Sequence, residues 1–472
     1  MPDSPLHYKT ITELGQMIQS KDISPVEVTK AILARIEELD SKYMSYATLM
    51  AEQALASAQQ AEDEIANGHY RGPLHGMPIA VKDLCFTKGV RTMGGSKVYL
   101  AHVPSFDSTV VERLESAGAV LLGKLNLTEG AMGGYNPALQ IPKNPWNVDR
   151  WAGSSSSGSG AATAAGMCYG SLGSDTGGSI RFPSAACGIV GLKPTWGRVS
   201  RYGVLALAES LDHVGPMTRS SADAAIMLQA IAGQDSNDPT TLPAPVPNML
   251  ENIGDGVKGL RLGWDENYAT KDVDPELAQA VADGVKVLEG LGAEIVTIQM
   301  PDVDKYVPAW PVLCSAEAVA AHTENYPERR DDYGPWFRGW LDQGAEVTGA
   351  QYAKANNMRA ECNGLVREAF QNIDVLACPS MTRPAHPVTV EMNYGPMDDR
   401  RGTAFQKYTA PYDFNGAPTL SVPCGLNSDG LPLSLQIVGK HLSEALLCQV
   451  GHAYEGATDW HDLHPPVLKA RQ

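Results

Sequence analysis

The sequence predicts an α/β fold, a single large domain built on a parallel or mixed β-sheet. Segments with helical spacing of apolar residues alternate with short apolar runs, first at 108–126 and again from 221 to 298. The chain has 472 residues, of which 43% are hydrophobic and 19% charged, so a large core can form without metal or disulfide support. Neither a long linker nor a repeat divides the chain, which favours one domain over residues 1–472.

The first part of the chain, residues 1–70, is expected to form a helical region. Ser24 and Glu27 make a capping box, and Pro25 stands at the first helical position. Apolar residues then recur at helical spacing and give the helix one apolar face. A second helix is expected over 48–67.

Short strands and helices alternate through the rest of the chain. The first strand is expected over 77–82 (MPIAVK) and ends at Lys82. Further elements are expected within 108–126 (a helix, then a strand) and at 221–232 (helix), 260–263 (strand), 274–291 (helix), 294–298 (strand) and 375–378 (strand). Two late runs, 420–423 and 433–438, are expected to form a closing hairpin.

The segment 304–370 is expected to be a helical insertion in this domain. It is rich in aromatic residues, namely Tyr306, Trp310, Tyr326, Tyr333, Trp336, Phe337, Trp340 and Tyr352. Packing in the core and between helices is the ordinary use of such residues. The alternative is an aromatic wall that shapes a substrate pocket, and the sequence leaves both readings open.

The composition favours a soluble, cytoplasmic protein. The net charge of −17 and the pI of about 5.1 argue against direct binding of nucleic acid. The eight cysteines are scattered without a CxxC pair, as in proteins that keep their thiols reduced. Neither a signal peptide nor an apolar segment long enough to span a membrane is evident, so no membrane partner is expected.

The motifs of nucleotide- and metal-dependent enzymes are incomplete or absent in this chain. Residues 118–124 imitate a phosphate-binding P-loop, but Leu125 stands where a serine or threonine must hold magnesium. Cys168 lies between Gly166 and Gly170 like a nucleophile elbow, although a buried cysteine on an alanine-rich helix explains it better. No HExxH occurs, and the eleven histidines form no group with ligand spacing. We therefore expect neither a metal nor a cofactor.

Residues 153–160 (GSSSSGSG) are dense in glycine and serine, a composition that also occurs in flexible linkers. A small-residue helix start at 161–165 follows directly, and a second Gly/Ser stretch occupies 170–181. Linkers join domains, whereas this region lies inside a continuous αβ pattern. We therefore favour tight turns and close approach of the backbone.

Residues 175–179 (DTGGS) carry the sharper signal. Two glycines before a serine let several backbone N–H groups converge on one point, as an oxyanion hole requires; an anion nest or ordinary turn is the alternative. Ser179 would then be a nucleophile that needs a base, and the nearest histidines in sequence are His102 and His213. A buried lysine can serve if its pKa is lowered, and Lys82 suits such burial, although most lysines at strand ends are solvated.

Taken together, these segments resemble the amidase signature family. The resemblance rests on residues 76–83 (GMPIAVKD), 153–166 (GSSSSGSGAATAAG) and 173–181 (GSDTGGSIR). It continues in the segments 187–194, 197–203, 211–216, 420–425 and 430–436. It is strongest over 72–216, the expected catalytic core, and loosest over 300–410. The resemblance implies a central mixed, mostly parallel β-sheet flanked by helices on both faces, and hydrolysis of a carboxamide C–N bond.

The resemblance also implies a Ser–cisSer–Lys triad. Ser179 would attack the carbonyl carbon and form an acyl-enzyme, which water would then hydrolyse. Ser155 would take the proton of Ser179 and pass one to the leaving amine, and a neutral Lys82 would keep Ser155 competent as a base. The oxyanion would be held by the backbone N–H groups of Thr176, Gly177, Gly178 and Ser179.

The relay serine of this family follows a cis peptide bond, which here would join Ser154 to Ser155. The chain departs from the family pattern because Ser154 and Ser157 stand where glycines are usual. Four serines are adjacent, so Ser154 and Ser156 remain alternatives to Ser155 for the relay.

Two activities compete within the family. We favour a free-standing amidase that acts on aliphatic, aryl or anilide amides, with carbamates (urethanes) as an extension. The alternative is the glutaminase (A) subunit of a tRNA-dependent amidotransferase. Arg359 matches an arginine that binds the glutamine carboxylate there, although the end of a long helix explains it equally well. Gln406 replaces the acidic residue expected to hold the glutamine amino group.

A hypothesis from another class is a non-catalytic scaffold that keeps the fold and binds a ligand or partner. The joint presence of Lys82, Ser155 and Ser179 argues against it. The expected partner is a small-molecule amide or carbamate, and a homodimer is compatible with the sequence.

Overall fold

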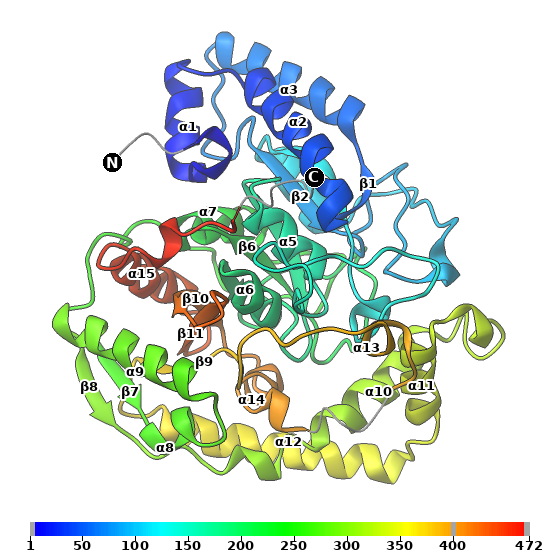
Figure 1. Ribbon diagram of the computed structural model, residues 1–472, viewed down its shortest axis with the longest axis vertical. Coiled ribbons are helices and arrows are strands. Elements are labelled where there is room, and N and C mark those ends of the chain that lie inside the picture. Colours follow the sequence, from blue (N-terminus) through cyan, green and yellow to red (C-terminus); the bar gives the residue numbers. More distant parts are fainter. Residues whose placement is uncertain (1–4, 398–402, 467–472) are drawn as a thin grey trace.

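The computed structural model describes residues 5–397 and 403–466. Its described strands form one eleven-stranded sheet, shown in Figure 1. From one edge to the other they are β1 (Tyr46–Leu49), β3 (Val120–Leu125), β2 (Pro78–Lys82), β4 (Gly170–Asp175), β6 (His213–Thr218), β5 (Val190–Lys193), β10 (Thr419–Leu426), β11 (Pro432–Gly439), β9 (Val375–Pro379), β7 (Arg261–Trp264) and β8 (Glu294–Thr297). The expected α/β domain with a central mixed sheet is confirmed.

The sheet is mixed but not mostly parallel, so that part of the expectation is wrong. Four of its strand pairs are parallel, namely β2–β3, β2–β4, β7–β8 and β7–β9, whereas six are antiparallel. A parallel pair needs a crossover connection, usually through a helix. In the middle of the sheet, β5 returns to β6 through the helix-free segment 194–212, and β10 returns to β11 through a short turn. These connections make the centre antiparallel.

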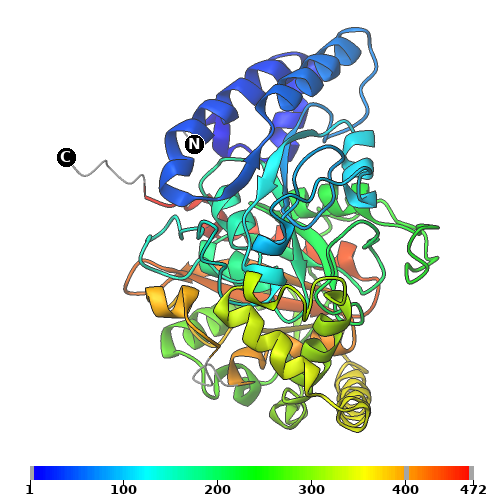
Figure 2. The same cartoon turned by 90° about the vertical axis from the view of Figure 1, so that its right-hand side faces the viewer.

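The described helices are α1 (Ile11–Ser20), α2 (Pro25–Tyr43), α3 (Ala51–Ala66), α4 (Thr109–Ser116), α5 (Ser157–Ala164), α6 (Arg181–Cys187), α7 (Ser221–Ile231), α8 (Glu266–Thr270), α9 (Pro275–Gly290), α10 (Ala309–Ala321), α11 (Pro335–Ala345), α12 (Gly349–Ala369), α13 (Val390–Tyr394), α14 (Ala410–Phe414) and α15 (Glu444–Glu455). The expected capping box at the start of α2 is present, with Ser24 and Glu27 bonded reciprocally. In Figures 1 and 2 the N-terminal helices lie at one end of the molecule and the insertion helices α10–α12 at the other.

Helices cover both faces of the sheet. A Cβ built on Gly170 of β4 would meet Met227 of α7, and one built on Gly173 would meet Ile180, which precedes α6. Residues three apart in a strand point to opposite faces, so α6 and α7 lie on opposite sides of β4. The helix-flanked arrangement implied by the resemblance is therefore confirmed.

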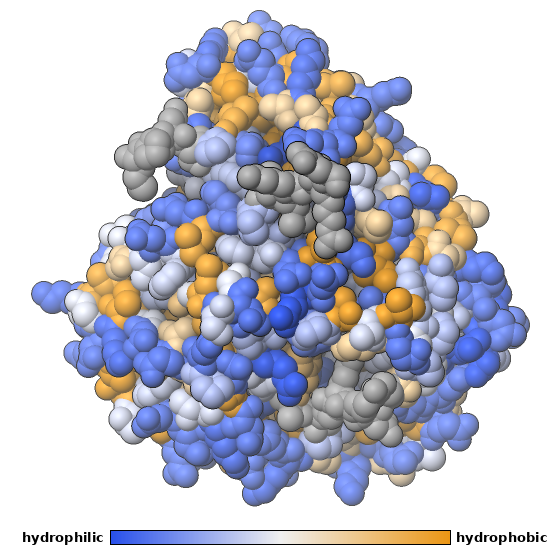
Figure 3. All heavy atoms as spheres, viewed as in Figure 1, coloured by the Kyte–Doolittle hydropathy of each residue, from blue (hydrophilic) through white to orange (hydrophobic). Residues whose placement is uncertain are grey.

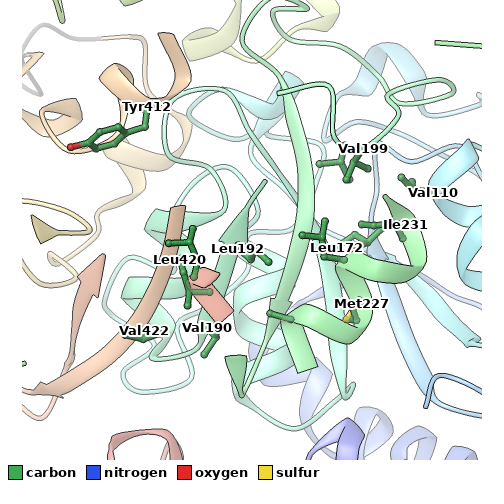
Figure 4. Packing of buried hydrophobic residues seen from close by; sticks show 14 of the residues in the cluster. Val110, Leu172, Val190, Leu192, Val199, Met227, Ile231, Tyr412, Leu420 and Val422 are labelled. Atoms are coloured by element: carbon green, nitrogen blue, oxygen red, sulfur yellow. The ribbon is translucent and has the colours of Figure 1, made fainter. Parts of the chain in front are cut away.

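The hydrophobic core extends along the sheet. Leu172 of β4, Met227 of α7 and Leu420 of β10 belong to one buried cluster, part of which appears in Figure 4. All eight cysteines are buried and free of disulfides. The face seen in Figure 3 is mostly hydrophilic, with its apolar atoms in small groups. In the described residues no helix has the length and apolarity needed to cross a membrane.

Candidate active site

Strand ends bring the candidate residues to one edge of the sheet. Lys82 is the last residue of β2 and Asp175 is the last residue of β4, and these strands are parallel neighbours. Their carboxyl ends therefore lie side by side. The serines 154–156 directly precede α5, and residues 176–180 connect β4 to α6. The expected catalytic residues thus come from three segments that are far apart in the sequence.

Lys82 is surrounded by serine hydroxyls. Its Nζ lies 2.7 Å from Ser155 Oγ, 2.8 Å from Ser156 Oγ and 2.8 Å from Ser174 Oγ. Burial lowers the pKa of Lys82 to about 7, because removal from water disfavours the ammonium form, and the charge of Asp175 offsets this only in part. Near neutral pH a large fraction of Lys82 is therefore an uncharged amine.

The three hydroxyls differ in their other hydrogen bonds. Ser156 Oγ donates to the carbonyl oxygen of Ser174 at 3.2 Å, so its single hydrogen is occupied and it can only accept from Lys82. Ser155 Oγ has no other hydrogen-bond partner in the described part of the chain. Its hydrogen is free to point at the lone pair of a neutral Lys82. Of the adjacent serines, Ser155 therefore has the geometry that a proton relay needs.

The turn formed by Ser154, Ser155 and Ser156 is hydrogen-bonded to the backbone of Ser179. The peptide bond between Ser154 and Ser155 is cis. The N–H of Thr128 donates to the carbonyl oxygen of Ser155 at 3.1 Å, and the N–H of Ser156 donates to the carbonyl oxygen of Ser179 at 3.4 Å. Lys82 thus contacts Ser155 directly, and the backbone of the next residue, Ser156, is bonded to that of Ser179; Lys82, Ser155 and Ser179 are all buried.

The turn after β4 is held by the Asp175 carboxylate. Its Oδ1 accepts from the N–H of Gly178 at 2.7 Å, and its Oδ2 accepts from the N–H of Ile180 at 2.9 Å. Arg181 donates to the same carboxylate through Nε at 3.0 Å and Nη2 at 2.8 Å. Burial alone would raise the pKa of Asp175, but the Arg181 guanidinium holds that pKa well below its usual range. Asp175 therefore remains a charged clamp on the turn.

The hydrogen bonds to Asp175 reduce the number of backbone N–H groups that are available to bind an oxyanion. The N–H of Gly178 is engaged by Asp175, which removes it from the expected set. The N–H groups of Thr176, Gly177 and Ser179 have no acceptor among the described residues. These three donors are left for an oxyanion.

A cavity of about 630 Å³ adjoins Ser179. Ser154, Thr176 and Gly177 also lie in its wall. Six aromatic side chains line it, namely Trp151, Phe182, Trp310, Trp336, Trp340 and Phe405. Pockets of this volume suit small molecules, and an apolar wall with a few polar groups is typical of them.

Comparison with known proteins decides the family. The family model described as Amidase matches residues 27–448. A Mycobacterium tuberculosis protein named "Putative amidase AmiD" is 42% identical over 458 residues, which are 97% of this chain and 96% of the relative. The chain belongs to the amidase family.

Two further matches lie within the same family. The glutamyl-tRNA(Gln) amidotransferase A subunit of Cyanothece sp. is 40% identical over 485 residues, which cover 97% of this chain and 100% of the relative. The structure of a bacterial aryl acylamidase of the amidase signature family aligns with a TM-score of 0.87 at 26% identity, covering 97% of this chain and 99% of that chain. The chain is accordingly an amidase, which hydrolyses a carboxamide C–N bond. The non-catalytic scaffold is set aside.

Some aromatic residues of the insertion (304–370) line the cavity, whereas the others lie outside its wall. Trp310, Trp336 and Trp340 line the cavity, although each is largely buried. The other five are not part of its wall: Tyr306, Tyr326, Tyr333, Phe337 and Tyr352. Phe337 and Tyr333, for example, pack around His322. The tryptophans form an aromatic wall, whereas the remaining rings pack or hydrogen-bond elsewhere in the insertion.

Sequence reasoning missed several residues of the amidase site. Ser156 and Ser174 were not assigned as contacts of Lys82, and the clamp formed by Asp175 and Arg181 was not foreseen. Both clamp residues stand in the family motif, and an aspartate directly before a glycine turn is a known signal for side-chain bonding to backbone N–H groups. Phe405 offered no local signal, because only the tertiary fold brings it to the cavity.

Proposed function

We propose that this amidase hydrolyses amides that carry aromatic or other hydrophobic groups, through an acyl-enzyme on Ser179. In this proposal Ser155 relays protons and a neutral Lys82 acts as its base. One observation carries the proposal, the 2.7 Å contact between Lys82 Nζ and Ser155 Oγ in a buried turn beside Ser179. A lysine in this setting, with its pKa near 7, can accept a proton at physiological pH.

The acylation step uses each of the three side chains. Ser155 passes its own proton to the neutral Lys82 and takes the proton of Ser179 as Ser179 Oγ attacks the carbonyl carbon. The N–H groups of Thr176, Gly177 and Ser179 stabilise the charge that develops on the carbonyl oxygen. Ser155 then delivers a proton to the amide nitrogen and recovers one from Lys82, the C–N bond breaks, and the amine leaves an ester on Ser179.

Deacylation runs the same relay with water in place of Ser179. Water gives a proton to Ser155, whose own proton passes to Lys82, and the water oxygen attacks the ester carbon. Ser155 then gives a proton to Ser179 Oγ and recovers one from Lys82 as the ester bond breaks. The products are one carboxylic acid and one amine for each amide and each water consumed.

The substrate class follows from the wall of the cavity. Two groups of contacting rings line it: Trp310, Trp336 and Trp340 form one group, and Trp151, Phe182 and Phe405 form the other. Aromatic walls favour flat apolar groups. We therefore propose aryl amides and anilides first, and aliphatic amides and carbamates (urethanes) as further substrates.

The first prediction tests the nucleophile. Wild-type protein should release aniline from benzanilide, and Ser179→Ala should lower kcat by at least ~10³-fold, because the acyl-enzyme can no longer form. Ser428→Ala, on an exposed turn, is the matched control and should keep full activity. Amine release from a panel of amides, anilides and carbamates provides the measurement. A fully active Ser179→Ala variant would refute the proposal.

The glutaminase reading remains the second candidate, because relatives named as amidotransferase subunits share about 40% of the sequence. Arg359, which would bind the glutamine carboxylate, instead donates to the carbonyl oxygen of Phe414 at 2.8 Å and to Ser210 Oγ at 2.9 Å. It is not part of the cavity wall, whereas the neutral Gln406 is. Arg359 therefore ties α12 to the end of α14 and to the loop that carries Ser210, which favours the free-standing amidase. Ammonia release from glutamine only in the presence of a partner protein, without anilide hydrolysis, would favour the glutaminase.

The remaining expectations belong to the same proposal. We propose that the protein acts in the cytoplasm on a small molecule, without binding nucleic acid. The homodimer and the subdivision into a helical region (1–70), a catalytic core (72–216) and a pocket-shaping insertion (304–370) also stay predictions. The three insertion tryptophans in the cavity wall support the last of these.

A further inference from the structure

Glu129 lies outside the reacting residues, yet it joins two parts of the cavity wall. We propose that Glu129 is a positioning residue that sets the affinity of this amidase for aromatic substrates by holding Trp336 in place. The inference rests on the proposed hydrophobic-amide function and deepens it. It concerns binding, not the chemistry on Ser179.

The Glu129 carboxylate accepts three hydrogen bonds from three segments. Its Oε1 accepts from Ser96 Oγ at 2.6 Å and from Asn136 Nδ2 at 2.8 Å. Its Oε2 accepts from the N–H of Gly334 at 2.7 Å. The residue is 1% exposed, so water does not replace these partners. Burial raises the pKa of Glu129 to about 7, so the carboxylate is ionised above neutral pH. Its charge-assisted hydrogen bonds are then stronger than neutral ones and hold their donors in fixed positions.

The third bond caps the helix that carries two wall tryptophans. Gly334 is the N-cap of α11 and has no side chain to bind the free N–H groups of the first turn. Glu129 instead accepts from the N–H of Gly334 itself, and the negative charge of the ionised carboxylate is favourable at a helix N-terminus. A Cβ on Gly334 would come within 2.5 Å of Glu129 Oε2, so only glycine allows this approach. Trp336 and Trp340 follow in the first turns of α11 and line the cavity.

Glu129 also belongs to the loop on which α11 rests. Ala131, Met132 and Gly133 of this loop line the cavity. A Cβ built on Gly133 would lie 2.9 Å from the Trp336 ring, and one built on Gly134 would lie 2.5 Å from Trp336 Cβ. The loop backbone therefore lies against Trp336. The carboxylate fixes the loop and the start of α11 to each other, and Trp336 lies between them.

An alternative role of Glu129 is to support Ser155, because the same loop also contacts that residue. Thr128, the neighbour of Glu129, donates its N–H to the carbonyl oxygen of Ser155 at 3.1 Å. If Glu129 chiefly supported the relay serine, its loss would lower kcat for every substrate. If it positions Trp336, its loss should raise KM for aromatic substrates and leave small aliphatic ones unaffected. The size of the substrate therefore separates the two roles.

The experiment compares benzanilide with propionamide in the full-length protein. For Glu129→Ala we expect KM for benzanilide to rise about tenfold, with kcat retained and kcat/KM for propionamide unchanged. Glu129→Gln keeps the shape and one acceptor oxygen, so it should restore part of the affinity. The Kd of benzanilide can be measured by tryptophan fluorescence in the Ser179→Ala variant, which cannot form an acyl-enzyme. Adding Glu129→Ala to this variant should raise that Kd about tenfold.

Two controls keep the test specific. Glu455 is also buried, and it accepts hydrogen bonds from the N–H and Oγ of Ser221 at the start of α7, away from the cavity. Glu455→Ala should lower stability and leave both KM values unchanged. In a Trp336→Leu background, Glu129→Ala should raise the KM for benzanilide little further. The effects of two substitutions are not additive when one residue acts through the other.

The experiment distinguishes a failure of the Glu129 proposal from a failure of the proposed function. Equal changes for both substrates, a loss of kcat without a change in KM, or full additivity with Trp336→Leu would each overturn the proposal. If the wild type hydrolyses neither amide, the proposed function fails, but the fluorescence measurement still tests Glu129. A Glu129→Ala variant that does not fold leaves Glu129→Gln, for which an unchanged Kd would contradict the proposal.

Discussion

Lys82 is surrounded by hydroxyl groups, and this surrounding determines its charge. Each of its three hydrogen-bond partners is a neutral serine, so no carboxylate in direct contact offsets the loss of hydration. Burial therefore lowers the pKa of Lys82 to about 7. A lysine of ordinary pKa would be fully protonated at neutral pH and could not accept a proton from Ser155.

This residue gives the pH prediction. Lys82 must lose its proton to act as a base, so kcat should rise as the pH increases through about 7 and level off above it. Burial also raises the pKa of Glu129 to about 7, so kcat for propionamide, which should not depend on Glu129, is the quantity to measure. A profile that is flat from mildly acid to alkaline pH, or full activity in Lys82→Ala, would contradict the role of Lys82.

The candidate residues differed in how far the sequence could predict them. Ser179 follows from its own glycine turn, since converging N–H groups beside a serine point to acyl transfer. Lys82 follows only from the family resemblance, because a lysine at a strand end is ordinary by itself. Glu129 could not be predicted, since its three partners are brought to it by separate segments of the fold.

At the scale of elements, the turn between β4 and α6 has a tightly constrained backbone. Gly178 has a φ of +125°, and a Cβ at this position would lie 2.3 Å from the Phe182 ring. The turn must also present its N–H groups to the Asp175 carboxylate and to the substrate. The glycine is therefore required by both the backbone conformation and the close approach of Phe182.

Replacement of this glycine gives the next prediction. Gly178→Ala should displace the turn and lower kcat by about 10²-fold, as the loss of an oxyanion donor does. The control is Gly364→Ala in α12, where nothing lies within 4 Å of the added Cβ. That change should stabilise the protein by about 1 kcal/mol and leave kcat unchanged. Thermal unfolding and anilide hydrolysis measure both effects; an undiminished kcat in Gly178→Ala would show that the turn is not part of the catalytic machinery.

Elements with a clear apolar pattern were predictable, including β2, which ends at Lys82, whereas other strands at the site were not. Helices such as α2 and α9 show apolar residues at helical spacing, and the structure confirms them. The strands β1, β4, β5 and β6 were not foreseen. β4 reads GSLGSD, and glycine, serine and aspartate have low preference for strands. Its conformation depends on pairing with β2 and β6 on either side.

At the scale of the whole molecule, the sheet holds the site together. The segments that carry Lys82, Ser155 and Ser179 are joined to it through β2, β4 and the adjoining helices. The cavity wall, by contrast, comes from the catalytic core, the insertion helices and the segment that follows them. In the proposed mechanism the reacting residues lie at the ends of sheet strands and in the adjoining turns, whereas the substrate preference would be set by the cavity wall. This division explains why the sequence predicted the reaction better than the substrate.

The most direct test of the account is to trap the acyl-enzyme. Wild-type protein mixed with an aryl carbamate, which should deacylate slowly, is quenched in acid, and its peptides are analysed by mass spectrometry. We predict a mass increase equal to the carbamoyl group on the peptide that contains Ser179, and none in Ser179→Ala. Turnover without an adduct on Ser179, or an adduct on Ser155 or a cysteine instead, would contradict the account.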